Sequence, residues 1–173
     1  MSDASIPATA DLVRAKNQAL DELLLAAIDK SDPSSIHVDP GNGEWTLAQN
    51  LGHIGEFPRF FAADLLAWRS DRSRAIGRTH DHDRRNAAVE SASRRDYEGL
   101  RDDCRGALVE LAAALGSLED EDIEAVTTNV KYGQEPLRAY LGRYILGHKE
   151  GHVDQLQRTL AVVREQQAAH ERS

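Results

Sequence analysis

Four segments of the 173-residue chain repeat apolar residues every three or four positions, and this spacing constrains the fold more than any other sequence feature. It places the apolar side chains on one face of an α-helix, which must then be buried. Four amphipathic helices joined by shorter polar segments are most simply packed against one another. The pattern therefore predicts an all-α fold, an antiparallel four-helix bundle.

The first two helices have clear boundaries. One is predicted over residues 9–30, because the proline at position 33 cannot continue a helix. Residues 34–44 contain two further turn signals, proline and a Gly-Asn-Gly triplet, and are predicted to form a loop. The second helix begins at Thr46, which forms a capping box with Gln49. Pro58 lies inside it and predicts a kink near His53. The buried face of the first helix is predicted as Leu12, Ala15, Ala19, Leu23 and Ala27, and that of the second as Leu47, Leu51, Ile54, Phe57, Phe61, Leu65 and Leu66, with Phe60 and Trp68 at its edge.

The second half of the chain predicts two more helices. Residues 70–91 are polar and are expected to form an irregular connection. The third helix is predicted to begin near Ser93, with Asp96 as its capping partner, and to end at Gly116. Residues 119–134 are expected to form a loop with at most a small hairpin, and Pro136 is expected as the first residue of the fourth helix. The predicted buried faces are Tyr97, Leu100, Cys104, Leu108, Leu111 and Leu115, then Leu137, Leu141, Tyr144, Ile145, Leu156 and Leu160.

Length and charge limit the classes of protein. The chain is expected to form a single domain over residues 1–173, with a core at about 9–164. No run of eighteen apolar residues exists, and the net charge of −8 argues against a nucleic-acid partner. The first eleven residues contain neither a basic group nor an apolar stretch, so no secretory signal is expected and a cytoplasmic location is predicted.

Three histidines form the candidate site. His148 and His152 are four residues apart, so both imidazoles lie on one face of the fourth helix, in line with its buried residues. His53 lies on the apolar arc of the second helix. Three inward imidazoles at about 2.1 Å from a zinc-like ion would leave coordination positions open for water or substrate, as in catalytic sites. Core histidines bonded to neighbouring groups are the alternative, and the residues alone favour neither.

Other candidate groups have simpler interpretations. Glu56, one turn after His53, would orient a ligand or move a proton, but an exposed glutamate is the commoner case. The His-Asp-His-Asp run at residues 80–83 is interpreted as a solvated loop rather than a loose metal site. Cys104 is interpreted as a small core residue. Arg59 and Arg143 are weak candidates for binding substrate carboxylates.

Two motifs resemble the DinB-like (DinB/YfiT) family. They are EWTLAQNLGHI at residues 44–54 and GHKEGHVDQL at residues 147–156, and a Tyr-Gly turn followed by PLRAYL precedes the second. The resemblance implies an up-down-down-up four-helix bundle, often a homodimer, with a divalent metal on three histidines. In this sequence the three histidines of the family correspond to His53, His148 and His152. Pro58 departs from the pattern.

The resemblance also implies a reaction class. Some members transfer low-molecular-weight thiols, which the metal activates, so a thiol S-transferase acting on a small-molecule substrate is the leading hypothesis. Three imidazoles suit zinc, nickel, iron or cobalt. The alternatives are a metal-dependent hydrolase of a small substrate and a stress-associated metal-binding protein without catalysis.

Overall fold

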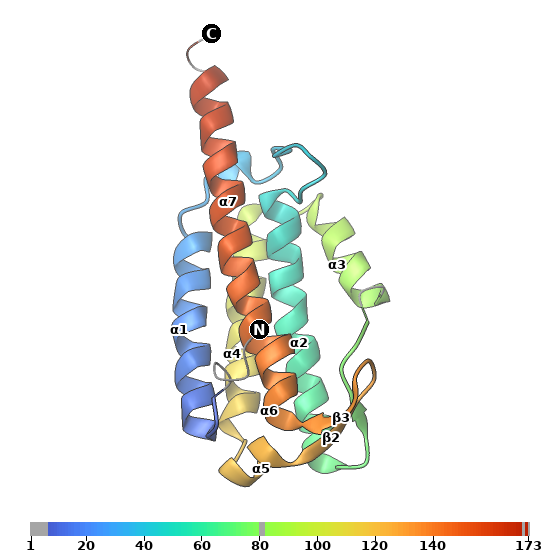
Figure 1. Ribbon diagram of the computed structural model, residues 1–173. Helices are drawn as coiled ribbons and strands as arrows, with labels where there is room; N and C mark the ends of the chain where they lie inside the picture. Colours follow the sequence, from blue (N-terminus) through green and yellow to red (C-terminus); the bar gives the residue numbers. More distant parts are fainter. Residues whose placement is uncertain (1–6, 80–81, 171, 173) are drawn as a thin grey trace.

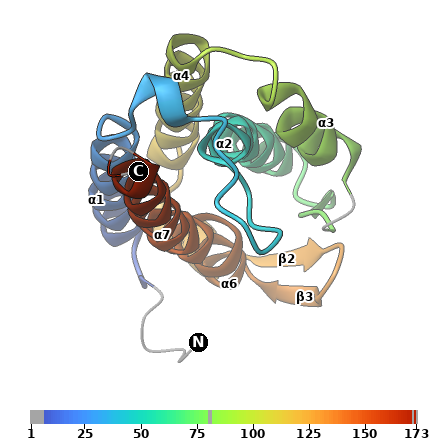
Figure 2. The ribbon, with the colours of Figure 1, turned by 90° about the horizontal axis from the view of Figure 1, so that it is seen from above.

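Four long helices lie side by side in the computed structural model, which describes residues 7–79, 82–170 and 172 (Figure 1). Along the chain they run up, down, down and up, so the second and third have the same direction (Figure 1). Figure 2 shows all four around a common centre, with the short helix α3 outside this group, next to α2. The long helices are α1 (Ala10–Ile28), α2 (Leu47–Ser70), α4 (Tyr97–Gly116) and α7 (Gly147–His170). The four-helix bundle predicted from the periodicity is therefore confirmed.

Helix α1 has the predicted extent but buries a different face. Thr9 caps it through a hydrogen bond from the Leu12 amide, whereas the Leu12 and Leu23 side chains are exposed. The predicted stripe is therefore wrong, apart from Ala27. Apolar residues at adjacent positions allow two overlapping stripes, and the one that is buried contains the polar Asn17. The buried residues are Ala10, Val13, Asn17, Leu20, Leu24, Ala27 and Ile28.

Helix α2 follows a loop with a short 3₁₀ helix, η2 (Pro33–Ser35). Its predicted capping box is present: the Gln49 amide donates to the Thr46 hydroxyl, and the Gln49 side chain accepts from the Thr46 amide. The predicted arc is buried except for Leu66, which is exposed, while Trp68 is fully buried rather than at an edge. Pro58 lies inside the helix, and the kink stays a prediction.

The segment predicted to be irregular contains helix α3 (Asp83–Ala92), so that prediction is wrong. The helix lacks an apolar stripe, because only Ala92 is fully buried. It instead packs closely against α2 at Gly52, where a Cβ would lie 2.6 Å from the Ala92 Cβ and 2.7 Å from the Ala88 carbonyl oxygen. A contact between small residues gives no periodic signal, which explains the error.

Helix α4 begins later than predicted. Asp96, not Ser93, is its cap and accepts from the Gly99 amide, while Ser93 ends α3. Its predicted stripe is buried throughout. A short helix, α5 (Asp120–Glu124), and the predicted hairpin of β2 (Val126–Asn129) and β3 (Gly133–Pro136) follow. The sequence did not predict α5, nor the strand β1 (Ala75–Ile76) that pairs in parallel with β2.

The fourth predicted helix is divided into three parts. Pro136 precedes the helix as its cap rather than being its first residue, and α6 (Leu137–Tyr140) leads into a π-helical segment, η3 (Leu141–Leu146). Helix α7 then starts one residue before His148. Of the predicted buried face, only Tyr144 is partly exposed. Among the helices described, none combines the length and apolar character needed to cross a membrane.

Candidate metal centre

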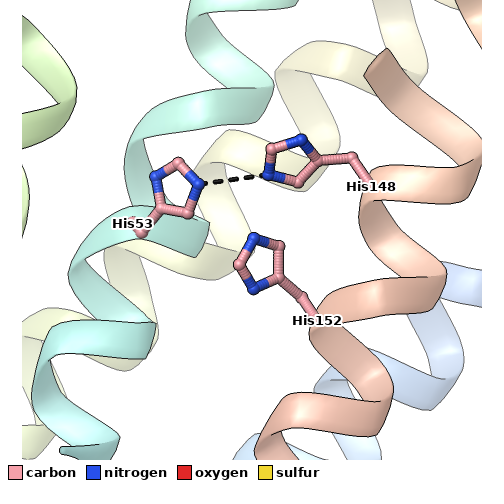
Figure 3. Close-up of side chains that lie close together, drawn as sticks. All are labelled: His53, His148 and His152. Carbon is pink, nitrogen blue, oxygen red and sulfur yellow. Dashed lines mark hydrogen bonds between the residues drawn. The ribbon is translucent and has the colours of Figure 1, made fainter. Parts of the chain in front are cut away.

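The three predicted histidines converge between α2 and α7 (Figure 3). The His53 Nε2 lies 3.1 Å from the His148 Nε2, and one nitrogen from each ring lies within 4.8 Å of the others. Nitrogens around a zinc-like ion at about 2.1 Å would be about 3.0–3.4 Å apart, so small side-chain rotations would complete such a set. The geometry thus brings together all the residues that the sequence singled out as ligands.

The helical frame determines this convergence. His148 and His152 are one turn apart on α7, with ring centroids 4.7 Å apart, and both face the first half of α2. The His53 ring lies 5.3 Å and 4.9 Å from theirs. Phe57, one turn after His53, stacks on the His148 ring at 4.5 Å and on the His152 ring at 5.5 Å. An aromatic wall therefore shields one side of the cluster from water.

Burial keeps the imidazoles of His53 and His152 neutral. Desolvation, followed by the charges of His152 and His148, holds the pKa of His53 far below its ordinary value. Desolvation also lowers the pKa of His152 to about 4, although Gln155 opposes the shift through a hydrogen bond. Neutral imidazoles offer a lone pair to a cation at neutral pH. His53 and His152 are therefore in the protonation state that metal binding requires.

Two ring nitrogens in the cluster lack hydrogen-bond partners. His53 is 2% exposed and His152 is 7% exposed, and the Nδ1 of each is buried without a partner. Burying an unpaired polar nitrogen is costly, so a cluster built only for packing would be expected to pair it. The cluster is therefore poorly paired for packing alone, and its set of three nitrogen donors fits a divalent metal ion.

A buried ion pair lies behind His53. Glu56 accepts from both terminal nitrogens of Arg78, at 2.6 and 2.7 Å, and its Oε2 lies 3.8 Å from the His53 Nδ1. The side chain of Glu56 is 9% exposed, so its interpretation as an exposed glutamate is wrong. Arg78 was not predicted, because it comes from the connection after α2 and nothing in its neighbourhood marks it. A carboxylate close to the far nitrogen of a ligand histidine is the usual way to fix the ring's tautomer and orientation.

Two pockets meet at the histidines. One has a volume of about 160 Å³ and the other about 320 Å³, and His53, His148 and Arg85 line both. The smaller pocket is also lined by Phe61, Arg78, Thr79, Lys131, Tyr132, Arg143 and Tyr144. The larger is also lined by Gly43, Glu44, Trp45, His152 and Gln155. The cluster is accordingly accessible from two directions.

The remaining candidates lie apart from the histidines, except for Arg143. Arg59 bonds to Glu110 and to the Gly55 carbonyl and lines neither pocket, so its prediction as a binding residue is not supported. Cys104 is in the core as predicted, where its thiol donates to the Leu51 carbonyl and burial raises its pKa to about 12. In the 80–83 run, positions 80 and 81 lie outside the described residues, and His82 caps α3.

Comparison with known proteins identifies the family. A family model described as the DinB superfamily matches residues 17–156, which is most of the chain. The chain belongs to the DinB superfamily. No curated protein sequence matches it.

Solved structures share this DinB fold at low sequence identity. YfiT from Bacillus subtilis, described as a probable metal-dependent hydrolase with an unusual four-helix bundle topology, has a TM-score of 0.70 and 17% identity. That alignment covers 96% of this chain and 90% of YfiT. A mycothiol-dependent maleylpyruvate isomerase has a TM-score of 0.66 and 10% identity. That alignment covers 94% of this chain but only 63% of the length of the isomerase. An uncharacterised protein from Clostridium difficile 630 has a TM-score of 0.64 and 10% identity. That alignment covers 86% of this chain and 94% of the Clostridium difficile chain.

Proposed function

We propose that His53, His148 and His152 bind a divalent metal ion and that the protein is a metal-dependent enzyme that transfers a low-molecular-weight thiol to a small substrate. The observation that carries this proposal is the convergence of three histidines, of which His53 and His152 are buried, where two pockets meet. Zinc, nickel, iron and cobalt all suit three imidazoles. Such an ion would lower the pKa of a thiol or water in an open position and make it nucleophilic at neutral pH.

Residues of the chain would prepare the reaction. The Glu56–Arg78 pair would hold the His53 ring in the tautomer that presents Nε2, because the carboxylate lies on the Nδ1 side. Phe57 would exclude water from the face of His148 that it covers. The two pockets would place two reactants on either side of the histidines, which is the arrangement that a transfer between two small molecules needs.

The paired pockets favour transfer over hydrolysis, because hydrolysis requires room for only one organic reactant. The fold shared with a mycothiol-dependent isomerase adds support. The fold shared with YfiT, a probable metal-dependent hydrolase, keeps hydrolysis as the second candidate. A protein that binds the metal without catalysis is the third, and protein side chains in all coordination positions would favour it.

Metal analysis tests the site. Purified protein and the variants His53→Ala, His148→Ala and His152→Ala would be dialysed against a buffered divalent metal and analysed by mass spectrometry. We expect one ion per chain in the unchanged protein and loss of it in each variant. His37→Ala is the matched control, because that ring is exposed and bonds to the Arg95 carbonyl, away from the cluster. Full metal content in all three variants would refute the proposal.

A reactant panel tests the reaction. The metal-loaded protein would be mixed with small electrophiles, with and without glutathione, cysteine or other low-molecular-weight thiols. Transferase activity predicts product only when a thiol is present. Turnover that is unaffected by every thiol would favour hydrolysis, and absence of turnover with every pair would favour metal binding alone.

A further inference from the structure

We propose that the smaller pocket binds the carboxylate groups of a small organic acid, with Lys131, Arg143 and Arg85 as its recognition residues. The inference deepens the proposed function by naming the class of its substrate and rests on it for the reaction, although the binding itself is independent of the metal.

The lining of this pocket has a charge opposite to that of the molecule. The chain as a whole carries a formal net charge of −8, yet the pocket is lined by four cations and by no carboxylate. The cations are Arg85, Lys131 and two arginines that form ion pairs with carboxylates outside the lining, Arg78 with Glu56 and Arg143 with Glu135. Cations gathered around a concave site raise the local concentration of anions, and guanidinium groups match the two oxygens of a carboxylate. The larger pocket, in contrast, includes Glu44.

A buried amide holds one wall of the pocket in place. Asn129, which ends β2, is 2% exposed, and its side-chain oxygen accepts from the backbone amides of Lys131 at 2.8 Å and Tyr132 at 3.3 Å. The same oxygen lies 3.4 Å from the Tyr144 hydroxyl, and the side-chain nitrogen donates to Glu135 at 2.7 Å. The turn between β2 and β3 is thereby fixed over the histidines, with its lysine at the pocket.

Arg143 is oriented from two sides. Its Nη1 donates to both oxygens of Glu135 at 3.0 Å, and its guanidinium lies 4.0 Å from the centroid of the Tyr132 ring. Arg78 is fixed in the same way by Glu56. Arg143 is therefore preorganised, which reduces the entropy lost when it binds an anion. Lys131 has no carboxylate within 4.0 Å among the described residues, so its charge remains available to a ligand.

Helix α3 supplies the opposite wall. Its close packing on Gly52, the residue before His53, brings Arg85 to the border of both pockets, with the guanidinium 5.0 Å from the Trp45 ring. The floor includes Phe61 and Tyr144, which suit the carbon skeleton of a ligand. A volume of about 160 Å³ accommodates a ligand of a few carbon atoms. The carboxylate would thus anchor a small acid beside His53 and His148.

Calorimetric titration with succinate tests the inference, with succinamide as the uncharged analogue of the same shape. Both would be titrated into the full chain, with and without metal. We expect succinate to bind and succinamide to bind at least about fivefold more weakly, since an exposed charge pair contributes up to about 1 kcal/mol. Equal binding of the two probes, or no succinate binding at millimolar concentrations, would overturn the inference.

Variants locate the binding. Lys131→Gln is expected to weaken succinate about fivefold, and combining it with Arg85→Gln is expected to weaken it further. The matched controls are Lys30→Gln and Arg94→Gln, both exposed and outside the pocket, the latter two residues after the end of α3. Equal affinity in Lys131→Gln and its control would refute the inference. That failure is separate from failure of the proposed function, which would appear as unchanged metal content in the histidine variants.

Discussion

Helix α7 carries two polar clusters, and they differ in whether their buried polar atoms have hydrogen-bond partners within the protein. His148 and His152 meet His53 of α2, whereas Lys149, the residue between them that is 0% exposed, faces α1. The lysine donates to the Asn17 side chain at 2.6 Å and to Asp21, and Asn17 donates to Asp21 at 2.9 Å. Burial lowers the pKa of Lys149, and the charge of Asp21 opposes that shift. The lysine cluster is thus closed within itself.

The histidine cluster is not closed. Two of its buried nitrogens have no partner, although the lysine cluster one residue away shows that this fold can pair buried polar groups. Pairing within the protein is what a cluster needs when it serves packing alone, since an unpaired buried group costs about 1–3 kcal/mol. The difference indicates that the lysine cluster serves the fold, and it supports the proposal that the histidine cluster serves a ligand.

The largest expected effect separates the two clusters by metal affinity. His152→Leu removes a proposed ligand and should weaken metal binding by more than about 100-fold, beyond the range seen when only a supporting group is changed. In the metal-free protein the same change removes a buried ring whose Nδ1 has no partner, together with its hydrogen bond to Gln155, so stability should change little. Chelator competition and urea unfolding measure the two quantities. Unchanged metal affinity would contradict the comparison.

Lys149→Met should show the opposite pattern. It leaves Asp21 without its cation in a mostly buried position and should cost about 3 kcal/mol of unfolding free energy. Metal content should stay at that of the unchanged protein, because Lys149 points away from the histidines. Adding Asp21→Asn should restore part of the stability, since no buried charge is then unpaired. Loss of metal without loss of stability would break the distinction between the clusters.

Glu56→Gln sharpens the account of the histidine side. The substitution removes the negative charge beside the Nδ1 of His53 and should weaken metal binding about 10–100-fold, while all three proposed ligands remain. Glu110→Gln is the matched control, because Glu110 pairs with Arg59 on the exposed side of the bundle. Equal metal affinities in these two variants would remove Glu56 from the site.

Gly52→Ala should leave the lysine cluster unchanged, because its effect should be confined to the histidine side. The new methyl group meets Ala92 and Ala88 of α3, and such overpacking costs about 1–3 kcal/mol. Displacement of α3 should also weaken succinate binding by moving Arg85. Gly116→Ala at the end of α4 is the control, because no atom lies within 4 Å of its added Cβ. Thermal unfolding and calorimetry that give the same values for both variants would argue against α3 as a wall of the pocket.

The sequence could predict what is local. The capping box of α2 depends on residues three apart, and the spacing of His148 and His152 alone puts both on one helical face. The face of α1 depends instead on a contact across the bundle. Asn17 is buried because Lys149 donates a hydrogen bond to it. A polar residue at that position interrupts the apolar periodicity of the buried face, so the periodicity favours the exposed face instead. The true stripe is visible only when both helices are considered together.

The same reason explains what was missed around the site. Helix α3 is held by small residues against Gly52, and Arg78 reaches Glu56 across 22 positions of sequence. Neither contact leaves a periodic or motif signal. In the sequence Asn129 has the pattern of an ordinary turn residue, and only the paired strands bring its side-chain amide next to the Tyr144 hydroxyl. Ligand residues on regular helices were therefore predictable, whereas the groups that support them and line the pockets were not.

The central claim is that one metal ion binds to the three histidines, and anomalous diffraction from a metal-loaded crystal tests it most directly. We predict a single strong peak about 2.1 Å from a ring nitrogen of each of His53, His148 and His152, with at least one coordination position open to the pockets. A peak at other residues, or no peak between α2 and α7 in crystals of metal-saturated protein, would contradict the claim.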